Sequence, residues 1–109
     1  MDQENLRKLI EEILTNTREL NLATTDGDLP WVAVLVFGHD KDFNLYWISY
    51  ENARHSQELI KNQNVAAAIT EQPTGGGKDK GLQIQGVARK LEEEEIVAAA
   101  REYFAKRGT

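Results

Sequence analysis

The sequence predicts a mixed α+β domain, mainly β, and three observations support that fold class. Apolar side chains recur at helical spacing near both ends of the chain. Between these ends, alternating apolar and polar residues mark strands, which glycine, proline and aspartate turn signals separate. A shorter helical pattern interrupts the strands in mid-chain. We expect a single domain, residues 1–109, with the order helix, three strands, helix, two strands, helix.

The N-terminal third predicts a helix followed by a hairpin. Apolar residues at i, i+3, i+4, i+7 and i+8 predict an amphipathic helix capped near Asp2, whose apolar face is formed by Leu6, Leu9, Ile10, Ile13 and Leu14. Residues 20–24 then alternate as in a strand. Because Asp26-Gly27-Asp28 is a turn signal and Pro30 opens the next strand, a hairpin is expected here.

The second strand of this hairpin is apolar at every position from Trp31 to Phe37. A strand tolerates that composition only when both of its faces are covered by the core, a partner subunit or a ligand. With one face open, a stripe of apolar surface would face water. The sequence therefore predicts that something covers the second face of residues 31–37.

The middle of the chain predicts a strand that leads through a polar turn into a short helix. Residues 43–48 alternate with period two, and Asn52 is a suitable N-cap for a helix from Ala53. The first turn carries Arg54 and His55, next to the free N–H groups and the positive dipole end of the helix. Such a place attracts a phosphate. The alternative is that both side chains simply face water.

The C-terminal half predicts two more strands and a third helix. Residues 64–70 suit helix or strand by propensity, and we expect a strand because a proline and three glycines soon follow. Residues 82–88 also alternate, and Gly86 suggests a sharp bend or a close backbone approach. Residues 92–95 start a helix that Gly108 closes, with one face formed by Ile96, Val97, Ala100, Tyr103 and Phe104.

Composition and charge exclude several classes of protein. Thirteen basic against eighteen acidic residues give a net charge of −5, so nucleic acid and anionic membrane surfaces are poor partners. There is no cysteine, which excludes disulfides and thiolate metal sites. The N-terminus is too charged for a signal peptide, and no apolar run reaches the roughly 20 residues that span a bilayer. We expect a cytoplasmic protein.

Three further motifs predict no chemistry of their own. The GGGK run at residues 75–78 lacks the earlier glycine and the following Ser or Thr of a phosphate loop, and we expect a mobile hairpin loop. His39 and His55 have no metal-site spacing, so no metal is expected. Neither Ser49 nor Ser56 sits in a nucleophile elbow.

The chain resembles the pyridoxamine 5'-phosphate oxidase-like FMN-binding split-barrel family. The resemblance runs from about Leu20 to Phe104 and lies in four stretches, WVAVLVF, LYWIS, ENARHSQELIKNQNVA and LQIQGVARKLEEEE. The Arg-His version of the central stretch is most similar to a small bacterial branch of that superfamily. The resemblance implies a six-stranded Greek-key split β-barrel, a homodimer, and FMN bound in a cleft between the two subunits.

The resemblance also implies which residues meet the cofactor. The FMN phosphate would contact Arg54 and His55, with Ser49 beside them. The isoalloxazine ring would meet the backbone of Ala33, Val34, Leu35 and Val36 together with Ile48, and Gln83 would reach the ring. The implied function is a flavin-dependent oxidoreductase of unknown substrate, in which the cofactor supplies the hydride chemistry. No catalytic side chain is assigned.

Four positions depart from the family pattern, and each changes what the resemblance implies. Ala33 and Gly38 stand where the true oxidases have an arginine and a lysine, so pyridoxamine-phosphate oxidation is not the expected activity. Ala53 replaces a serine that would bind the phosphate, at a cost of about 1 kcal/mol. His55 replaces a lysine and would be fully cationic only at low pH. The chain also stops before the strand with which relatives usually continue.

Two alternatives to FMN follow from the same fold. The cleft could hold haem or a deazaflavin without turnover, with His39 or His55 as the axial ligand of a haem. The protein could also be a flavin-free dimeric structural protein.

Overall fold

The computed structural model describes residues 2–72 and 77–107. Gly108 and residues 75–76 of the predicted 75–78 loop lie outside these residues. The elements follow the chain as α1 (Gln3–Asn16), β1 (Glu19–Thr25), β2 (Pro30–Val36), β3 (Gly38–His39), β4 (Leu45–Tyr46), α2 (Arg54–Lys61), β5 (Asn64–Glu71), β6 (Lys80–Val87) and α3 (Glu93–Arg107). The predicted mixed α+β class is confirmed, including the strand at 64–70.

The strands form two antiparallel sheets. The main sheet has four strands in the order β2-β1-β5-β6, and β3 and β4 make a second, two-stranded sheet. Phe37 joins the two sheets, because it lies between β2 and β3 and donates its N–H to the Arg18 carbonyl at 3.2 Å. The face of the main sheet that carries the buried side chains of β1 and β5 is here called the inner face, and the opposite one the outer face.

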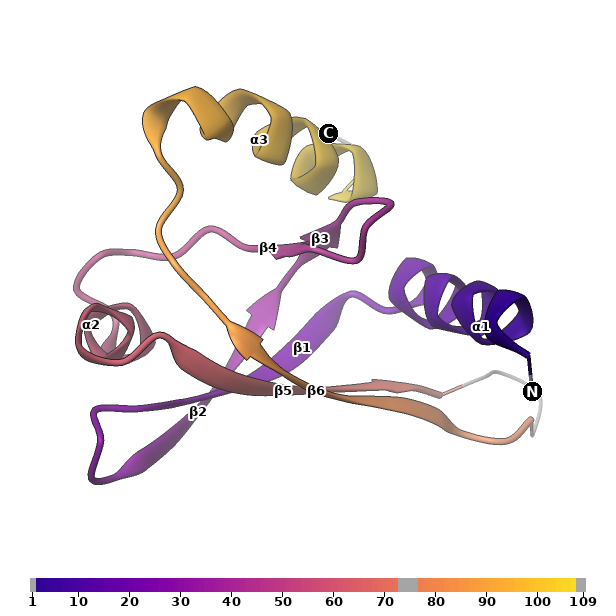
Figure 1. Ribbon diagram of the computed structural model, residues 1–109, viewed down its shortest axis with the longest axis horizontal. Helices are drawn as coiled ribbons and strands as arrows, with labels where there is room; N and C mark the ends of the chain where they lie inside the picture. Colours follow the sequence, from indigo (N-terminus) through magenta and orange to yellow (C-terminus); the bar gives the residue numbers. More distant parts are fainter. Residues whose placement is uncertain (1, 73–76, 108–109) are drawn as a thin grey trace.

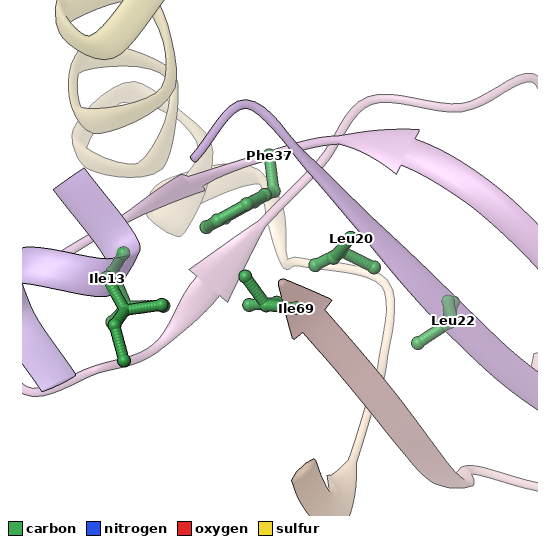
Figure 2. Close-up of a cluster of buried hydrophobic side chains, with 6 residues drawn as sticks. Ile13, Leu20, Leu22, Phe37 and Ile69 are labelled. Atoms are coloured by element: carbon green, nitrogen blue, oxygen red, sulfur yellow. The ribbon is translucent and has the colours of Figure 1, made fainter. Parts of the chain in front are cut away.

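The core lies on the inner face of the main sheet (Figure 2). Its fully buried members are Ile13, Leu14, Leu20, Leu22, Phe37 and Ile69, contributed by α1, β1, β5 and the β2–β3 junction. As predicted, α1 is capped by Asp2, whose carboxylate accepts the Asn5 N–H at 2.8 Å. Burying each large aliphatic side chain in this cluster contributes about 2 kcal/mol.

Each helix packs at a different place. Helix α1 contacts β5 and β6, α2 contacts β1 and β2, and α3 contacts β3 and β4. Figure 1 shows α3 over the small sheet, with α1 and α2 toward opposite ends of the main sheet. The junction between α2 and the β1–β2 hairpin is the place where the sequence predicts an anion site.

Helix α3 lies unusually close to β3, and Gly38 allows it. A Cβ atom at Gly38 would lie 2.6 Å from the Tyr103 Cα and 3.2 Å from the Glu102 carbonyl oxygen. The close contact between β3 and the backbone of α3 therefore requires glycine at position 38. This packing gives a structural reason for the absence of a lysine there.

Several local predictions are wrong. Residues 43–48 do not form one strand: the Asp40 carboxylate accepts the N–H groups of Asp42 and Asn44, both at 2.9 Å, and Phe43 takes a left-handed backbone with φ 66°, so only β4 pairs. The close backbone approach expected at Gly86 is absent from the described structure, since a Cβ there would meet nothing within 4 Å, and the β5–β6 register continues through Gly86.

The predicted face of α3 is only partly buried. Ala99 is buried and Tyr103 is half-buried against the small sheet. Ile96, Val97 and Phe104 are exposed instead. The contact with Gly38 explains the difference, because it turns the face that contains Tyr103, and Ala99 one turn earlier, toward the two-stranded sheet.

Candidate functional site

Helix α2 starts without a side-chain cap. Ala53 has the extended backbone of an N-cap residue (φ −64°, ψ 146°) but makes no side-chain capping hydrogen bond. The prediction of Asn52 as the cap is wrong, because the helix begins one residue later than its position requires. The first turn carries no acidic side chain. The positive end of the helix dipole is thus left uncompensated at this point.

Arg54 is held over the β1–β2 hairpin at this helix start. Its guanidinium carbon lies 4.2 Å from the centre of the Trp31 ring, and its Nε donates to Glu58 Oε2 at 3.0 Å. The side chain is 45% exposed. Among residues 2–72 and 77–107, no hydrogen bond occupies the Nη1 or Nη2 atoms. The fork of the guanidinium is therefore available to an anion.

The carboxylate that holds Arg54 is itself buried. Glu58 has a side chain only 7% exposed, and its Oε1 accepts the Thr24 hydroxyl at 2.6 Å. Hydrogen bonds from Thr24 and then Arg54 lower the pKa of Glu58 below its usual value, which keeps it ionised. Thr24 and Trp31 are register partners on β1 and β2. One patch of the hairpin thus fixes both Glu58 and Arg54.

His55 points into the protein rather than toward the helix start. It is 8% exposed, and its Nε2 lies 2.7 Å from the Ser49 Oγ. Burial lowers the pKa of His55 below its ordinary value of 6.5, so the ring is neutral near pH 7. The structure thus brings Ser49 and His55 together, and of the Arg54–His55 pair only Arg54 carries charge.

The residues predicted to meet a ring divide between the two faces of the main sheet. Ala33 and Leu35 are half-buried on the inner face, whereas Val34 is 61% exposed on the outer face. Val36 shares the outer face with Val34. Gln83 is also there, since Val34, Asn21, Ala68 and Gln83 form one row across the four strands. Strand spacing puts the ends of that row about 14 Å apart.

A single chain therefore does not bring all the predicted site residues together. Ile48 follows β4 and is 63% exposed. Arg54 reaches the apolar strand only at Trp31, on the inner side. The outer-face residues Val34 and Gln83 lie on the opposite side of the sheet. Any flat ligand that touches all of them needs a second surface.

Two hollows lie near other parts of the described structure. One of about 510 Å³ lies between α1, the β3–β4 turn and the end of α3, and its lining includes Arg7, Lys8, Glu11, His39, Lys41, Phe43 and Lys106. A smaller one of about 380 Å³ lies on the β5–β6 pair and includes Gln83 in its lining. The first contains none of the predicted flavin-binding residues, but it does contain His39.

Three residues that hold Arg54 were not predicted from the sequence: its partners Glu58 and Trp31, and Thr24, which donates to Glu58. Glu58 had a detectable signal, because an Arg and a Glu four residues apart face each other on a helix. Thr24 and Trp31 had none, since their contacts with α2 join segments far apart in the chain.

Metal binding and membrane insertion find no support in the described residues. Within residues 2–72 and 77–107, no group of three or more His, Cys, Asp or Glu side chains could hold a metal ion. In the same part of the chain, none of the helices combines the length and the apolar character needed to cross a bilayer.

Fold comparisons place the chain in the class of pyridoxamine 5'-phosphate oxidase-like split barrels. A candidate pyridoxamine 5'-phosphate oxidase from Listeria innocua matches with a TM-score of 0.75 and 26% identity, over 95% of this chain and 81% of that one. An FAD-binding protein from Mesorhizobium loti matches at 0.75 and 17%, over 99% and 75%. A haem-binding protein from Mycobacterium smegmatis matches at 0.75 and 20%, over 86% and 40%.

Within that class, the chain belongs to the UPF0306 family. It is 31% identical to a UPF0306 protein of Photorhabdus laumondii over 96 residues, which cover 86% of this chain and 67% of that protein. It is 34% identical to a UPF0306 protein of Enterobacter sp. (strain 638) over 79 residues, 72% of this chain and 55% of that protein. The chain thus spans about half to two thirds of these relatives. No protein-family model matches it.

Proposed function

We propose that the protein binds FMN as a homodimer and acts as a flavin-dependent oxidoreductase. One observation carries the proposal: Arg54 is stacked on Trp31 with its Nη fork available, beside an uncapped helix start. A guanidinium fork and free helix N–H groups are the donors that phosphates take in proteins. The split-barrel fold, shared with an FAD-binding protein and a candidate pyridoxamine 5'-phosphate oxidase, supports the choice of cofactor.

The residues fit the phosphate end of FMN. Arg54 would supply charge and the fork, and the first turn of α2 would supply N–H groups. When bound, the flavin supplies hydride and electron-transfer chemistry, while the protein binds and orients it. Ala33 is small and Gly38 has no room for a side chain, so neither brings the cation of a true pyridoxamine-phosphate oxidase. We therefore propose a different substrate.

The ring end requires a second copy of the chain, and the outer face of the main sheet offers the contact surface. Val32 and Val34 are 59% and 61% exposed there, and the small side chains of Ala66 and Ala68 lie on the neighbouring part of β5. Small, uncharged residues let a second sheet approach to about 10 Å. A partner on this face would cover the second side of the apolar strand, as its composition demands.

An FMN titration tests the cofactor. We expect purified protein to bind FMN with quenching of flavin fluorescence, and Arg54→Ala to weaken binding about 10- to 100-fold, since hydrogen bonds to charged groups contribute about 1.5–3 kcal/mol. Arg101→Ala, an exposed arginine on α3, is the matched control. Protein that binds no FMN contradicts the proposal. Binding of a deazaflavin in place of FMN would reassign the cofactor. If FMN changed the thermal stability of neither wild type nor Arg54→Ala, a flavin-free structural role would be favoured.

Light scattering after size-exclusion chromatography tests the dimer. Val34→Glu places a charge in the proposed interface, and we expect it to give monomers with weakened FMN binding. Ile60→Glu alters a similarly exposed aliphatic residue on α2 and should stay dimeric. A wild-type protein that binds FMN as a monomer would contradict the proposed dimer.

Haem is a second candidate, because the 510 Å³ hollow combines His39 with an aromatic ring and several cations. Arg7 stacks on Phe43 at 4.8 Å, and positive side chains could pair with propionates. His39 Nε2 lies 3.1 Å from Glu11 Oε1, so ligation requires that contact to open. Added haem should give a Soret band that His39→Ala removes and His55→Ala does not. A band unaffected by His39→Ala would exclude this site.

A further inference from the structure

Two contacts fix the orientation of the Arg54 guanidinium, and a third holds its carboxylate partner in place. The Trp31 ring covers a face of Arg54 at 4.2 Å, and Glu58 takes its Nε at 3.0 Å. Thr24, the register partner of Trp31, donates to the other oxygen of Glu58 at 2.6 Å. Each carboxylate oxygen thus has a separate partner. Rotation of the guanidinium would break either the ring contact or the Nε hydrogen bond.

The geometry differs from that of an ordinary surface ion pair. An exposed pair at this spacing contributes little and usually leaves both side chains in water. Here the carboxylate is 7% exposed, and a buried charge is costly unless it is hydrogen-bonded. The bond is also to Nε, the guanidinium nitrogen nearest the backbone. The outer Nη pair, which matches two oxygens of a phosphate, is left without a hydrogen bond among the described residues.

We propose that Glu58 is a positioning residue that holds Arg54 so that its Nη fork grips a phosphate monoester. The proposal rests on the FMN function proposed above and extends it to selection between phosphorylated and unphosphorylated flavin. Glu58 would not touch the ligand. Its effect passes through Arg54, with Thr24 holding Glu58 in place.

Charge and positioning predict opposite results when Glu58 is changed. A negative charge near an anion site weakens anion binding, so removing the charge alone should tighten the binding of FMN. Removing the oxygen that accepts the Nε hydrogen bond should instead loosen Arg54 and weaken the binding of FMN. Glu58→Gln removes the charge and keeps an oxygen acceptor, whereas Glu58→Ala removes both. The pair of variants separates the two effects.

The experiment compares FMN with riboflavin, which lacks the phosphate. For each variant the ratio of the riboflavin and FMN dissociation constants is measured by fluorescence titration. We expect wild type to prefer FMN, Glu58→Ala to lose about tenfold of that preference, and Glu58→Gln to keep or raise it. A merely structural role would weaken both ligands equally and leave the ratio unchanged.

The outcomes separate this inference from the proposed function. If wild type binds FMN with a preference that Glu58→Ala retains or increases, Glu58 does not position Arg54, although FMN binding stands. If wild type binds neither flavin, the proposed function fails and the inference fails with it. If wild type binds both equally, the phosphate does not reach Arg54 and the inference is wrong. Should Glu58→Ala fail to fold, Glu58→Asp, which keeps the charge but shortens the reach, must lower the ratio.

Discussion

The starts of α2 and α3 both carry an arginine bound to a glutamate, but the two arginines are left in opposite states. At α3, Arg89 forms two hydrogen bonds with Glu95, at 2.9 and 2.8 Å, and Glu95 also accepts the Glu92 N–H at 2.9 Å. Three acidic residues occupy the first turn of that helix. At α2, the first turn carries no acid, and Glu58 takes only the Nε of Arg54. One helix start is closed by its own side chains, and the other keeps its donors available.

This difference teaches that an arginine at a helix start is not by itself an anion site. Both Nη atoms of Arg89 donate to Glu95. The buried Glu58 instead accepts from the Nε of Arg54 and leaves its Nη atoms available. The acids of α3 compensate the helix dipole, and at α2 nothing in the first turn does so. We therefore expect ligands at α2 alone, and structural roles at α3.

The largest effect should come from Gly38, which sets the position of α3. Gly38→Ala places a Cβ 2.6 Å from the Tyr103 Cα and should lower the free energy of unfolding by about 1–3 kcal/mol, because a packed backbone cannot yield easily. Gly86→Ala, whose Cβ would meet nothing within 4 Å, is the control and should leave stability unchanged or higher. Urea denaturation measures both. Equal stability of the two variants would show that α3 is not held at Gly38.

Capping α2 should make it resemble α3. Ala53→Asp supplies the missing cap and should stabilise the ligand-free protein by about 1 kcal/mol. The same carboxylate competes with a phosphate for the N–H groups and repels it, so FMN affinity should fall about tenfold. Ala53→Asn caps without charge and should give a similar stability gain with a smaller loss of affinity. Stabilisation together with unchanged FMN affinity would place the phosphate elsewhere.

The contrast between the two helix starts could be predicted only in part from the sequence. The acidic run at residues 92–95 and the basic pair at Arg54 and His55 were visible as local charge at helix starts. The spacing of local residues also gave the position of each helix to within a residue or two. The burial of His55 was not predictable, because it depends on Ser49 and on how the 47–53 segment folds over the helix.

The other failures have one local cause and two long-range causes. The 43–48 strand failed because the side chain of Asp40 captured the backbone N–H groups that a ladder would use. The role of Gly38 depended on contacts with Glu102 and Tyr103, more than sixty residues later in the chain. The apolar run at 31–37 predicts a cover over its second face, which stays a prediction, and only the register shows that Val34 and Gln83 share that face.

The two helix starts should also respond to acid in different pH ranges, beginning with α2. The folded state lowers the pKa of His55 below 6.5, so the unfolded chain binds the proton more readily. Stability from the neutral ring is present above about pH 6.5 and is lost as the pH falls toward the folded pKa. His55→Gln keeps a hydrogen-bonding group for Ser49 without titrating. The difference in stability between wild type and this variant should shrink from pH 7.5 to 5.5, and a constant difference would contradict the assignment.

The smallest effect should come from Glu95 at α3, in a lower pH range. Hydrogen bonds from Arg89 and the Glu92 N–H lower the pKa of Glu95 from 4.5 to about 2. Its contribution is therefore present above pH 4.5 and is lost as the pH falls from 4.5 to 2. Because the pair is exposed, salt should weaken it and the melting temperature should shift only slightly. At pH 5 in low salt, Glu95→Gln should melt at a slightly lower temperature than wild type, and at pH 2 the two melting temperatures should be equal. The FMN affinity should be unchanged. A gain of FMN binding at α3 in this variant would mean that Glu95 alone had been closing an anion site, and that the two helix starts differ less than their contacts indicate.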